Sequence, residues 1–279
     1  MKLLVFTDLD ATLLDPWTYS WEAAAEALEA LKSLGAGIVL VSSKTFTEME
    51  PLYRELGLAD PFIVENGGGI VFGAQSPIAA QAAALRTLHD PISQAGYSMI
   101  PLGTPYGVLV QTLQDISREV GCPLRGFASM TDNEVAALTG LEMREAVGAR
   151  MRNYDEPFIV AESESRDEQI VNAARARGLL AVQGGRFWHL VGHNGKGAAV
   201  SVLLEMYRQK YPGLRTVALG DSPNDFPFLE LVEFPVLVGD QNRALLPDSL
   251  THVSRVAAGP EGWNVAILEI LLQLKEVEQ

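Results

Sequence analysis

Asp8 and Asp10 follow an apolar run near the start of the chain and stand two positions apart in the stretch VFTDLDATLLD. Residues i and i+2 of a strand face the same side, so these carboxylates would lie close together if the strand continued through them. Close carboxylates repel each other unless a cation or a proton lies between them. The pair is therefore a candidate acid–base or metal site, although two aspartates at this spacing are also common in a polar turn after a strand.

A second acidic stretch, VALGDSPND, carries Asp221 and Asp225 directly after another apolar run. In open α/β sheets, ligands bind outside the carboxyl ends of the strands, and Asp8, Asp10, Ser42 and Asp221 all fall at such ends. We expect these groups to converge on one crevice. Oxygen ligands of this kind suit Mg²⁺, with waters and a substrate phosphate completing its coordination. Taken alone, GDSPND would also fit a polar turn between a strand and a helix.

The elements that must position these residues alternate between strands and helices. Apolar runs predict buried strands over residues 2–7, 37–42 and 61–65, and helical spacing of apolar residues predicts helices between them. Thr47 and Glu50 are spaced as a capping box at the start of the second helix. The alternation resumes after residue 190. This pattern is typical of a parallel sheet covered on both faces.

Between these two parts the pattern changes. Residues 86–190 mix amphipathic helices, such as TDNEVAALTG and SRDEQIVNAARARG, with short strands, such as EPFIVAE and FWHLVG. Such a mixture favours an α+β domain inserted into the first. We therefore expect a core formed by residues 1–85 and 191–279, with a cap formed by residues 86–190.

Composition narrows the function classes. With 35 acidic and 21 basic residues, the net charge of −14 argues against a general nucleic-acid binder. The single cysteine, Cys122, excludes an internal disulfide and a cysteine-based zinc cluster. The chain has no apolar run long enough to span a membrane, and its first residues do not resemble a signal peptide. We expect a cytoplasmic protein with no membrane partner.

Four motifs in order resemble those of the haloacid dehalogenase superfamily of phosphatases. They are DLDATLLD, Ser42 in LVSSKT, Lys196 in GHNGKGAAV, and GDSPND. The resemblance implies a Rossmann-like parallel-sheet core with an inserted α/β cap. Several stretches are also similar to mannosyl-3-phosphoglycerate phosphatases, chiefly YDEPF and GGRFWH in the expected cap. One position departs from the superfamily pattern, since Ala11 stands where glycine is usual. If its φ angle is positive, alanine costs on the order of 1 kcal/mol there.

The resemblance implies roles for the catalytic residues. Asp8 would attack phosphorus and form an aspartyl-phosphate. Asp10 would protonate the leaving oxygen and then deprotonate the water that hydrolyses the intermediate. Ser42 would donate its hydroxyl to a phosphate oxygen, and Lys196 would balance the charge of Asp8 and the phosphate. Without the other motifs, Ser42 would be an ordinary strand-end serine and Lys196 a solvated surface lysine.

The metal and substrate ligands follow from the same resemblance. Mg²⁺ would be bound by Asp8, Asp10, Asp221 and Asp225. The candidates for recognising a small phosphorylated sugar acid are Ser43, Lys44, Asn66, Gly67, Gly68 and Arg186. We favour Arg186 for the substrate carboxylate because arginine can bind a carboxylate through two hydrogen bonds. His189 is expected to be a packed or tautomer-fixing residue.

The predicted function is a Mg²⁺-dependent phosphatase acting on mannosyl-3-phosphoglycerate or glucosyl-3-phosphoglycerate. Two alternatives remain open. One is a phosphatase of the same fold that acts on another sugar phosphate or on phosphoglycolate. The other is a non-catalytic binding module. The combination of Asp8, Asp10, Lys196 and Asp221 argues against a binding module, because such a module does not require all four.

Overall fold

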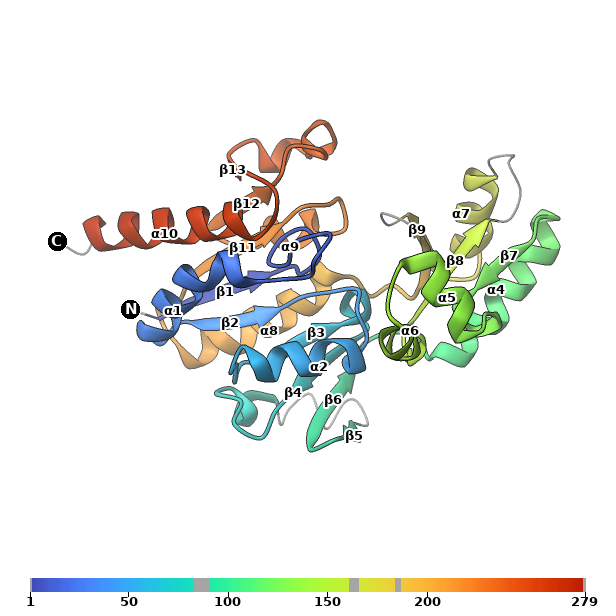
Figure 1. Ribbon diagram of the computed structural model, residues 1–279, viewed down its shortest axis with the longest axis horizontal. Coiled ribbons are helices and arrows are strands. Elements are labelled where there is room, and N and C mark those ends of the chain that lie inside the picture. Colours follow the sequence, from blue (N-terminus) through green and yellow to red (C-terminus); the bar gives the residue numbers. More distant parts are fainter. Residues whose placement is uncertain (1, 83–90, 161–165, 184–186, 278–279) are drawn as a thin grey trace.

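A five-stranded parallel sheet forms the centre of the larger lobe in this computed structural model (Figure 1). Its strands lie in the order β13-β12-β11-β1-β2. Their bounds are Leu3–Thr7 (β1), Gly37–Leu40 (β2), Arg215–Gly220 (β11), Phe234–Val238 (β12) and Ser254–Val256 (β13). The structure describes residues 2–82, 91–160, 166–183 and 187–277.

Alternation of side chains along β1 explains why both faces of this sheet are covered. Leu3 and Val5 pack into one buried cluster, whereas Leu4 and Phe6 pack into another. The first cluster includes apolar residues of α1 (Ala25–Ser33), α2 (Phe46–Glu55) and α10 (Gly259–Val277). The second includes residues of α8 (Lys196–Lys210) and α9 (Phe226–Leu229). The predicted parallel sheet with helices on both faces is confirmed.

Helix α2 begins two residues earlier than the sequence prediction placed it. Its N-cap is Thr45, whose hydroxyl accepts from the Glu48 N–H while the Glu48 carboxylate accepts from the Thr45 N–H. The predicted capping box of Thr47 and Glu50 is therefore wrong. The stretch TFTEME contains two overlapping matches to the motif. The earlier match lets Phe46, Met49 and Tyr53 bury one helix face.

A second, antiparallel sheet extends from the core, with strand order β3-β4-β6-β5. Its strands are Phe62–Val64 (β3), Gly69–Phe72 (β4), Ile92–Gln94 (β5) and Tyr97–Pro101 (β6). The sequence prediction placed the strand at 61–65 within the parallel alternation, but only a bridge between Val41 and Ile63 joins it to that sheet. The short turn at residues 65–68 makes β4 the antiparallel partner of β3, because a parallel crossover needs about a dozen residues or more.

A third sheet forms the smaller lobe, with strand order β7-β8-β10-β9 (Figure 1). Neighbouring residues of β8 face opposite sides. Phe158 packs in a cluster with residues of α4 and α7, and Ile159 packs against a cluster with residues of α5 and α6. The strands are Leu124–Gly126 (β7), Asp155–Val160 (β8), Leu180–Gln183 (β9) and Trp188–Val191 (β10). The helices are Tyr106–Val120 (α4), Asp132–Thr139 (α5), Met143–Arg150 (α6) and Asp167–Arg175 (α7).

The pairing of the strands suggests a later start for the cap than residue 86. Strands β5 and β6 follow that position, yet β6 pairs along its length with β4 of the core. A boundary at 86 would separate these hydrogen-bonded strands. We propose that the cap comprises residues 102–191, with the core on either side of it.

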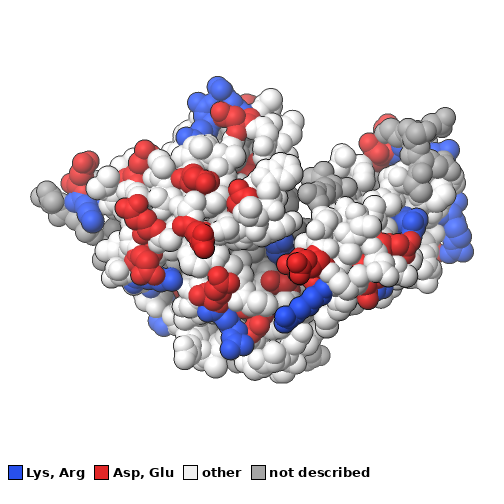
Figure 2. All heavy atoms as spheres, viewed as in Figure 1, with Lys and Arg blue, Asp and Glu red and all other residues white. Residues whose placement is uncertain are grey.

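The described chain also contains short 3₁₀ helices: Glu22–Ala24, Glu65–Gly67, Phe127–Ser129, Arg243–Leu245 and Asp248–Leu250. Among the helices of the described ranges, none combines the length and the apolar character needed to cross a membrane. On the face drawn in Figure 2, acidic side chains are spread over the larger lobe, in keeping with the net charge of −14.

Candidate active site

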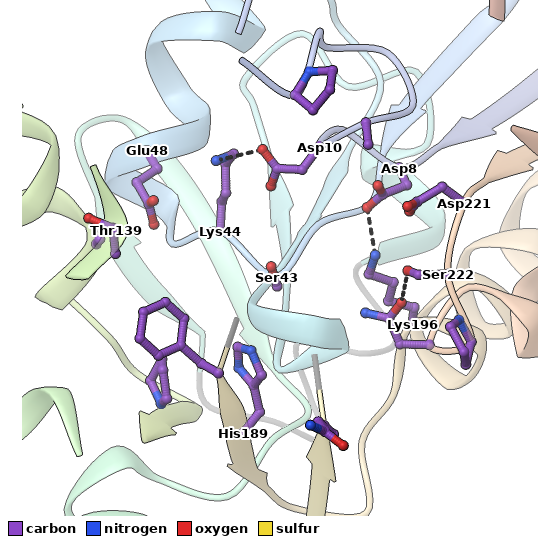
Figure 3. A pocket seen from close by; sticks show the side chains of 18 of the residues that line it. Asp8, Asp10, Ser43, Lys44, Glu48, Thr139, His189, Lys196, Asp221 and Ser222 are labelled. Atoms are coloured by element: carbon purple, nitrogen blue, oxygen red, sulfur yellow. Dashed lines mark hydrogen bonds and ion pairs between the residues drawn. The ribbon is translucent and has the colours of Figure 1, made fainter. Parts of the chain in front are cut away.

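A cavity of about 740 Å³ lies between the two lobes. The core contributes Asp8, Lys44 and Asp221 to its wall, and the cap contributes Phe127 and His189. Figure 3 shows these core groups on one side of the cavity and His189 on the other. The carboxyl ends of β1 and β11 therefore face the cap, as predicted for a ligand crevice.

Lys196 joins the first and the last acidic motifs. Its ammonium Nζ lies 2.6 Å from Asp8 Oδ1 and 2.7 Å from Asp225 Oδ1. All three side chains are buried. Burial alone would lower the pKa of Lys196, but the charges of Asp225 and Asp8 raise it above its ordinary value. A fixed positive charge thus lies against the Asp8 carboxylate.

Asp8, Asp221 and Asp225 each offer a carboxylate oxygen, and these oxygens lie within 4.8 Å of one another. Burial raises the pKa of Asp8 well above its ordinary value, and the neighbouring aspartates raise it further while Lys196 opposes them. Burial and the charge of Asp225 likewise raise the pKa of Asp221 to about 6. This cluster carries more negative charge than Lys196 balances. An all-oxygen donor set that lacks a balancing charge fits Mg²⁺.

Asp225 fixes the positions of its neighbours within this cluster. Its Oδ1 pairs with Lys196, while its Oδ2 accepts hydrogen bonds from the backbone N–H groups of Asp221 and Ser222. Because both oxygens are already engaged, Asp225 is suited to fixing the loop and orienting metal-bound water. Asp8 and Asp221, which line the cavity, are the better-placed direct ligands.

Asp10 does not share a strand face with Asp8, because β1 ends at Thr7. Its Oδ1 instead forms an ion pair with Lys44 Nζ at 3.0 Å, and Figure 3 shows the two side chains pointing toward each other. The Lys44 ammonium also lies 4.9 Å from the centre of the Tyr19 ring. Burial lowers the pKa of Lys44, but Asp10 and Glu48 outweigh it and raise the pKa above its ordinary value. Lys44 therefore stays charged and fixes Asp10 at the cavity wall.

Ala11 adopts a positive φ of 59°, and it also lines the cavity. The sequence analysis predicted backbone strain at Ala11 if its φ angle is positive. The angle is positive, and glycine adopts this left-handed conformation at a lower energetic cost than alanine. Its carbonyl accepts a hydrogen bond from the Gly259 N–H. The loop geometry that follows Asp10 is thus retained at a cost in backbone strain.

The predicted substrate-binding residues divide between the cavity and its surroundings. Ser43 lines the cavity. Ser42 is fully buried, and its hydroxyl oxygen accepts from the Lys44 N–H at 3.2 Å. The Asn66 side chain donates to Asp155 at 3.0 Å and accepts from Asn224 at 3.3 Å. Ser42 and Asn66 therefore lie behind the residues that line the cavity and hold them in place. Arg186, predicted to bind the substrate carboxylate, lies outside the described residues.

Gly67 and Gly68 occupy the turn between β3 and β4, where they allow close packing against the connections to the cap. A Cβ atom on Gly67 would lie 2.3 Å from the Gly195 carbonyl oxygen. One on Gly68 would lie 2.3 Å from the Tyr154 Cβ. The sequence suggested that the backbone of Gly67 and Gly68 contacts the substrate. In the structure this backbone lies close to Gly195 and Tyr154 instead.

Two cavity residues, Arg152 and His189, were not predicted to bind substrate. Both contact Asp155, which is fully buried. The His189 Nδ1 contact agrees with the expected tautomer-fixing role. For Arg152 the sequence offered one signal, its place two residues before the stretch YDEPF.

Comparison with known proteins identifies the family. A sequence profile of haloacid dehalogenase-like hydrolases matches residues 5–95. The chain is 38% identical over 275 residues to a glucosyl-3-phosphoglycerate/mannosyl-3-phosphoglycerate phosphatase from Methanococcoides burtonii, covering 97% of this chain and 98% of that protein. The chain belongs to this phosphatase family. A second member, from Persephonella marina, is 34% identical over 276 residues, and the alignment covers 98% of each chain.

The family assignment agrees with the fold. A crystal structure from Thermoplasma acidophilum superimposes with a TM-score of 0.65 at 21% identity, covering 99% of both chains. The expected α/β class with a parallel-sheet core and an added cap is therefore confirmed. Members of this phosphatase family are phosphoric monoester hydrolases, the enzyme class predicted from the four motifs.

Proposed function

We propose that this chain is a Mg²⁺-dependent phosphatase that hydrolyses the phosphate monoester of mannosyl-3-phosphoglycerate or glucosyl-3-phosphoglycerate. The observation that carries the proposal is the placement of Asp8 beside Lys196 and Asp221 in the wall of a cavity that the cap encloses. The names of the relatives supply the substrate. The cavity volume of about 740 Å³ is within the range of small-molecule sites.

In the first step, a carboxylate oxygen of Asp8 attacks phosphorus as the bond to the glycerate oxygen breaks. Asp10 donates a proton to the leaving oxygen, and the phosphoryl group remains on Asp8 as an acyl phosphate. Lys196 stabilises the negative charge on Asp8 and on the transferring oxygens. Once Asp10 has given up its proton, Lys44 holds the resulting carboxylate in place through the ion pair at 3.0 Å.

In the second step, Asp10 accepts a proton from a water molecule that attacks the phosphorus of the acyl phosphate. The bond to Asp8 breaks, inorganic phosphate leaves and the carboxylate is restored. Bound by Asp8 and Asp221, Mg²⁺ would supply positive charge that stabilises the phosphoryl oxygens. Phe127 and Leu141 make part of the cap side of the wall apolar.

The proposal is tested by comparing kcat/KM across a panel of phosphate esters. The panel holds mannosyl-3-phosphoglycerate, glucosyl-3-phosphoglycerate, phosphoglycolate, hexose phosphates and para-nitrophenyl phosphate. The two glycosyl-3-phosphoglycerates should give the highest values, and EDTA should abolish turnover until Mg²⁺ is restored. A higher value for another ester would move the proposal to that substrate, and full activity after verified metal removal would contradict the metal site.

A matched pair of variants tests whether the metal effect arises at this site. Asp221→Asn should raise the Mg²⁺ concentration needed for half-maximal activity by at least about tenfold, because it removes a charged metal ligand. Asp240→Asn removes an exposed carboxylate that does not line the cavity and should leave that concentration unchanged. Equal responses of the two variants would indicate a nonspecific ionic effect.

A further inference from the structure

The cap side of the cavity carries two basic side chains, among the described residues, that the phosphoryl-transfer steps do not use. Arg152 precedes β8, and His189 lies on β10. Both line the cavity, and both are mostly buried, with side-chain exposures of 6% and 13%. Figure 3 shows the His189 ring projecting into the cavity from its strand. Their shared feature is a contact with one buried carboxylate.

That carboxylate, Asp155, fixes the orientation of both side chains. Its oxygens lie 2.9 and 3.0 Å from His189 Nδ1, and Oδ2 accepts from Arg152 Nη1 at 3.3 Å and from Asn66 at 3.0 Å. Burial alone would raise the pKa of Asp155, but His189, Arg152 and Asn66 together lower it. Asp155 therefore remains ionised behind the wall, where it is fully buried.

Each of the two side chains has an unused nitrogen. Arg152 Nε donates to the Ala149 carbonyl at 2.8 Å, and Nη1 donates to the Ser43 carbonyl at 3.1 Å and to Asp155. Nη2 has no hydrogen-bond partner among the described residues. Since Asp155 engages Nδ1 of His189, Nε2 is the ring nitrogen left for a ligand. Asp155 therefore orients both side chains, while Arg152 Nη2 and His189 Nε2 remain available to a ligand.

The other cationic side chains of the cavity are paired with the aspartates to which the phosphoryl-transfer steps are assigned. Lys196 is paired with Asp8 and Asp225, and Lys44 is paired with Asp10. Among the described residues that line the cavity, Arg152 and His189 are the remaining basic ones. They lie on the cap side, away from the nucleophile. A substrate whose phosphate is at Asp8 would turn its other end toward them.

We propose that Arg152 and His189 form the site that binds the carboxylate of the substrate. The identity of this group as the carboxylate of a 3-phosphoglycerate rests on the proposed function. Arg152 donates from Nη2, and His189 contributes Nε2, the ring nitrogen that Asp155 leaves unengaged. The site thereby distinguishes phosphorylated glycerates from phosphate esters that lack a carboxylate.

Glu48 lies in the neighbouring part of the wall, close enough to Arg152 for its charge to act on the guanidinium. Its carboxylate is tied to the Thr45 N–H at 2.8 Å. A fixed carboxylate repels another carboxylate and accepts hydrogen bonds from hydroxyl groups. Glu48 is therefore suited to accept hydrogen bonds from the sugar hydroxyls of the substrate.

The test compares two competitive inhibitors of para-nitrophenyl phosphate hydrolysis, 3-phosphoglycerate and glycerol 3-phosphate. They share the phosphate and the three-carbon chain and differ at the carboxylate. The full-length wild-type protein should bind 3-phosphoglycerate at least about tenfold more tightly, as expected for charge-assisted hydrogen bonds. Arg152→Met should reduce this preference to about twofold or less, and His189→Gln should reduce it by about threefold or more.

Arg125→Gln is the matched control. It removes a cap arginine that is paired with Glu134 at the surface and that does not line the cavity. This variant should keep the wild-type preference. If Arg152→Met does not fold, as judged by circular dichroism, His189→Gln decides the question, because Arg152 still occupies Asp155 in that variant.

The outcomes separate this inference from the proposed function. A wild-type protein with no preference, or folded variants that keep the full preference, would overturn the carboxylate site even if glycosyl-3-phosphoglycerates are hydrolysed. A preference that depends on both residues would support the site even if another phosphorylated acid proves to be the better substrate. If para-nitrophenyl phosphate is not hydrolysed, calorimetric titration of the same inhibitors in Mg²⁺ gives the same ratio.

Discussion

The Asp8 carboxylate lies in surroundings that disfavour its charge until a cation joins it. Burial and three nearby aspartates raise its pKa, and Lys196 alone does not offset them. A metal ion bound beside Asp8 would add the positive charge that favours its carboxylate, the form that attacks phosphorus. This coupling ties the chemistry at Asp8 to occupation of the metal site.

Replacing Asp8 with asparagine should remove turnover and preserve the fold. We expect kcat to fall by at least about a thousandfold, because asparagine cannot form the acyl phosphate. In EDTA the variant should unfold at the same temperature as the wild type or higher, since it removes a buried charge that folding disfavours. Thermal unfolding with and without Mg²⁺ checks this, and the stabilisation by Mg²⁺ seen for the wild type should be lost. A variant that retains near-normal kcat without deamidation would contradict the covalent mechanism.

Ala11 provides a test of backbone strain at the same loop. Because its φ is 59°, Ala11→Gly should stabilise the protein by up to about 1 kcal/mol, the strain relieved exceeding the added freedom of the unfolded chain. Ala30→Gly in helix α1 should do the opposite by a similar amount, about 1 kcal/mol. Urea unfolding of both variants gives the comparison. Destabilisation by Ala11→Gly would show that the loop carries no strain at this residue.

At the residue scale, the strand ends predicted that Asp8 and Asp221 would converge, and the family resemblance added Lys196. Asp8, Lys196 and Asp221 follow apolar strands or begin a helix at recognisable motifs, and the structure brings them together. Arg152 and His189 depend on Asp155, which lies three and thirty-four positions away from them. The contact with His189 spans thirty-four positions and has no local pattern, whereas for Arg152 the one signal was its place beside the stretch YDEPF.

Among the elements, the turn between β3 and β4 joins the core to the base of the cap. Glu65, Asn66 and Gly67 all have positive φ angles, an unusual run of left-handed residues. The Glu65 carboxylate accepts hydrogen bonds from the backbone N–H groups of Asn153 and Tyr154, at 2.8 to 3.0 Å. These bonds offset the strain of the turn and fix the connection that leads to Arg152 and Asp155.

The Glu65 carboxyl group makes this connection sensitive to pH. Burial raises its pKa to about 7 from the ordinary 4.5, although Arg152 and the backbone N–H groups oppose the shift. The folded state therefore binds a proton more tightly than the unfolded state, so this contribution to stability is lost as the pH rises through about 7. Relative to Glu65→Gln, the wild type should lose on the order of 3 kcal/mol of unfolding free energy between about pH 5 and about pH 8.

Urea unfolding of the wild type and Glu65→Gln across this range measures the difference. A free-energy difference that does not change with pH would show that Glu65 is ionised throughout. A difference that grows in favour of the wild type would reverse the sign of the proposed pKa shift.

Element types were easier to predict from sequence than their pairing. The strand at 61–65 and the helices at 131–140 and 165–178 are present close to their expected places. The sequence placed β3 in the parallel alternation, but only the parallel bridge from Val41 to Ile63 joins it to that sheet. The length of the turn after β3, rather than the apolar pattern, decides that β4 pairs with it antiparallel. The start of α2 was wrong because two capping boxes overlap in the sequence, and burial of Phe46 favours the earlier one.

For the molecule as a whole, contacts between the lobes surround the cavity. The Thr45 hydroxyl donates to the Gly148 carbonyl at 2.9 Å, and Arg152 donates to the Ser43 carbonyl at 3.1 Å. Each of these bonds joins the cap to the segment between β2 and α2, beside the site. Opening of the cap would break them, whereas the Glu65 contacts lie at the base. These contacts are therefore the ones expected when the cap is closed over the core.

We expect the cap to move between this state and a more open one. A phosphate-mimicking fluoride complex bound with Mg²⁺ should favour closure, because closure brings Arg152 and His189 to a site that also contains Asp8. Small-angle X-ray scattering should show a smaller radius of gyration on saturation. An unchanged scattering curve at saturation would indicate a rigid cap.

The central claim is that Asp8 receives the phosphoryl group of a glycosyl-3-phosphoglycerate. The most direct test is rapid acid quench of the protein during turnover of mannosyl-3-phosphoglycerate, followed by mass spectrometry of its peptides. The account predicts one added phosphoryl group on Asp8, formed only with Mg²⁺, more abundant in Asp10→Asn and absent from Asp8→Asn. Turnover without a phosphorylated peptide, or a phosphoryl group on another residue, would contradict it.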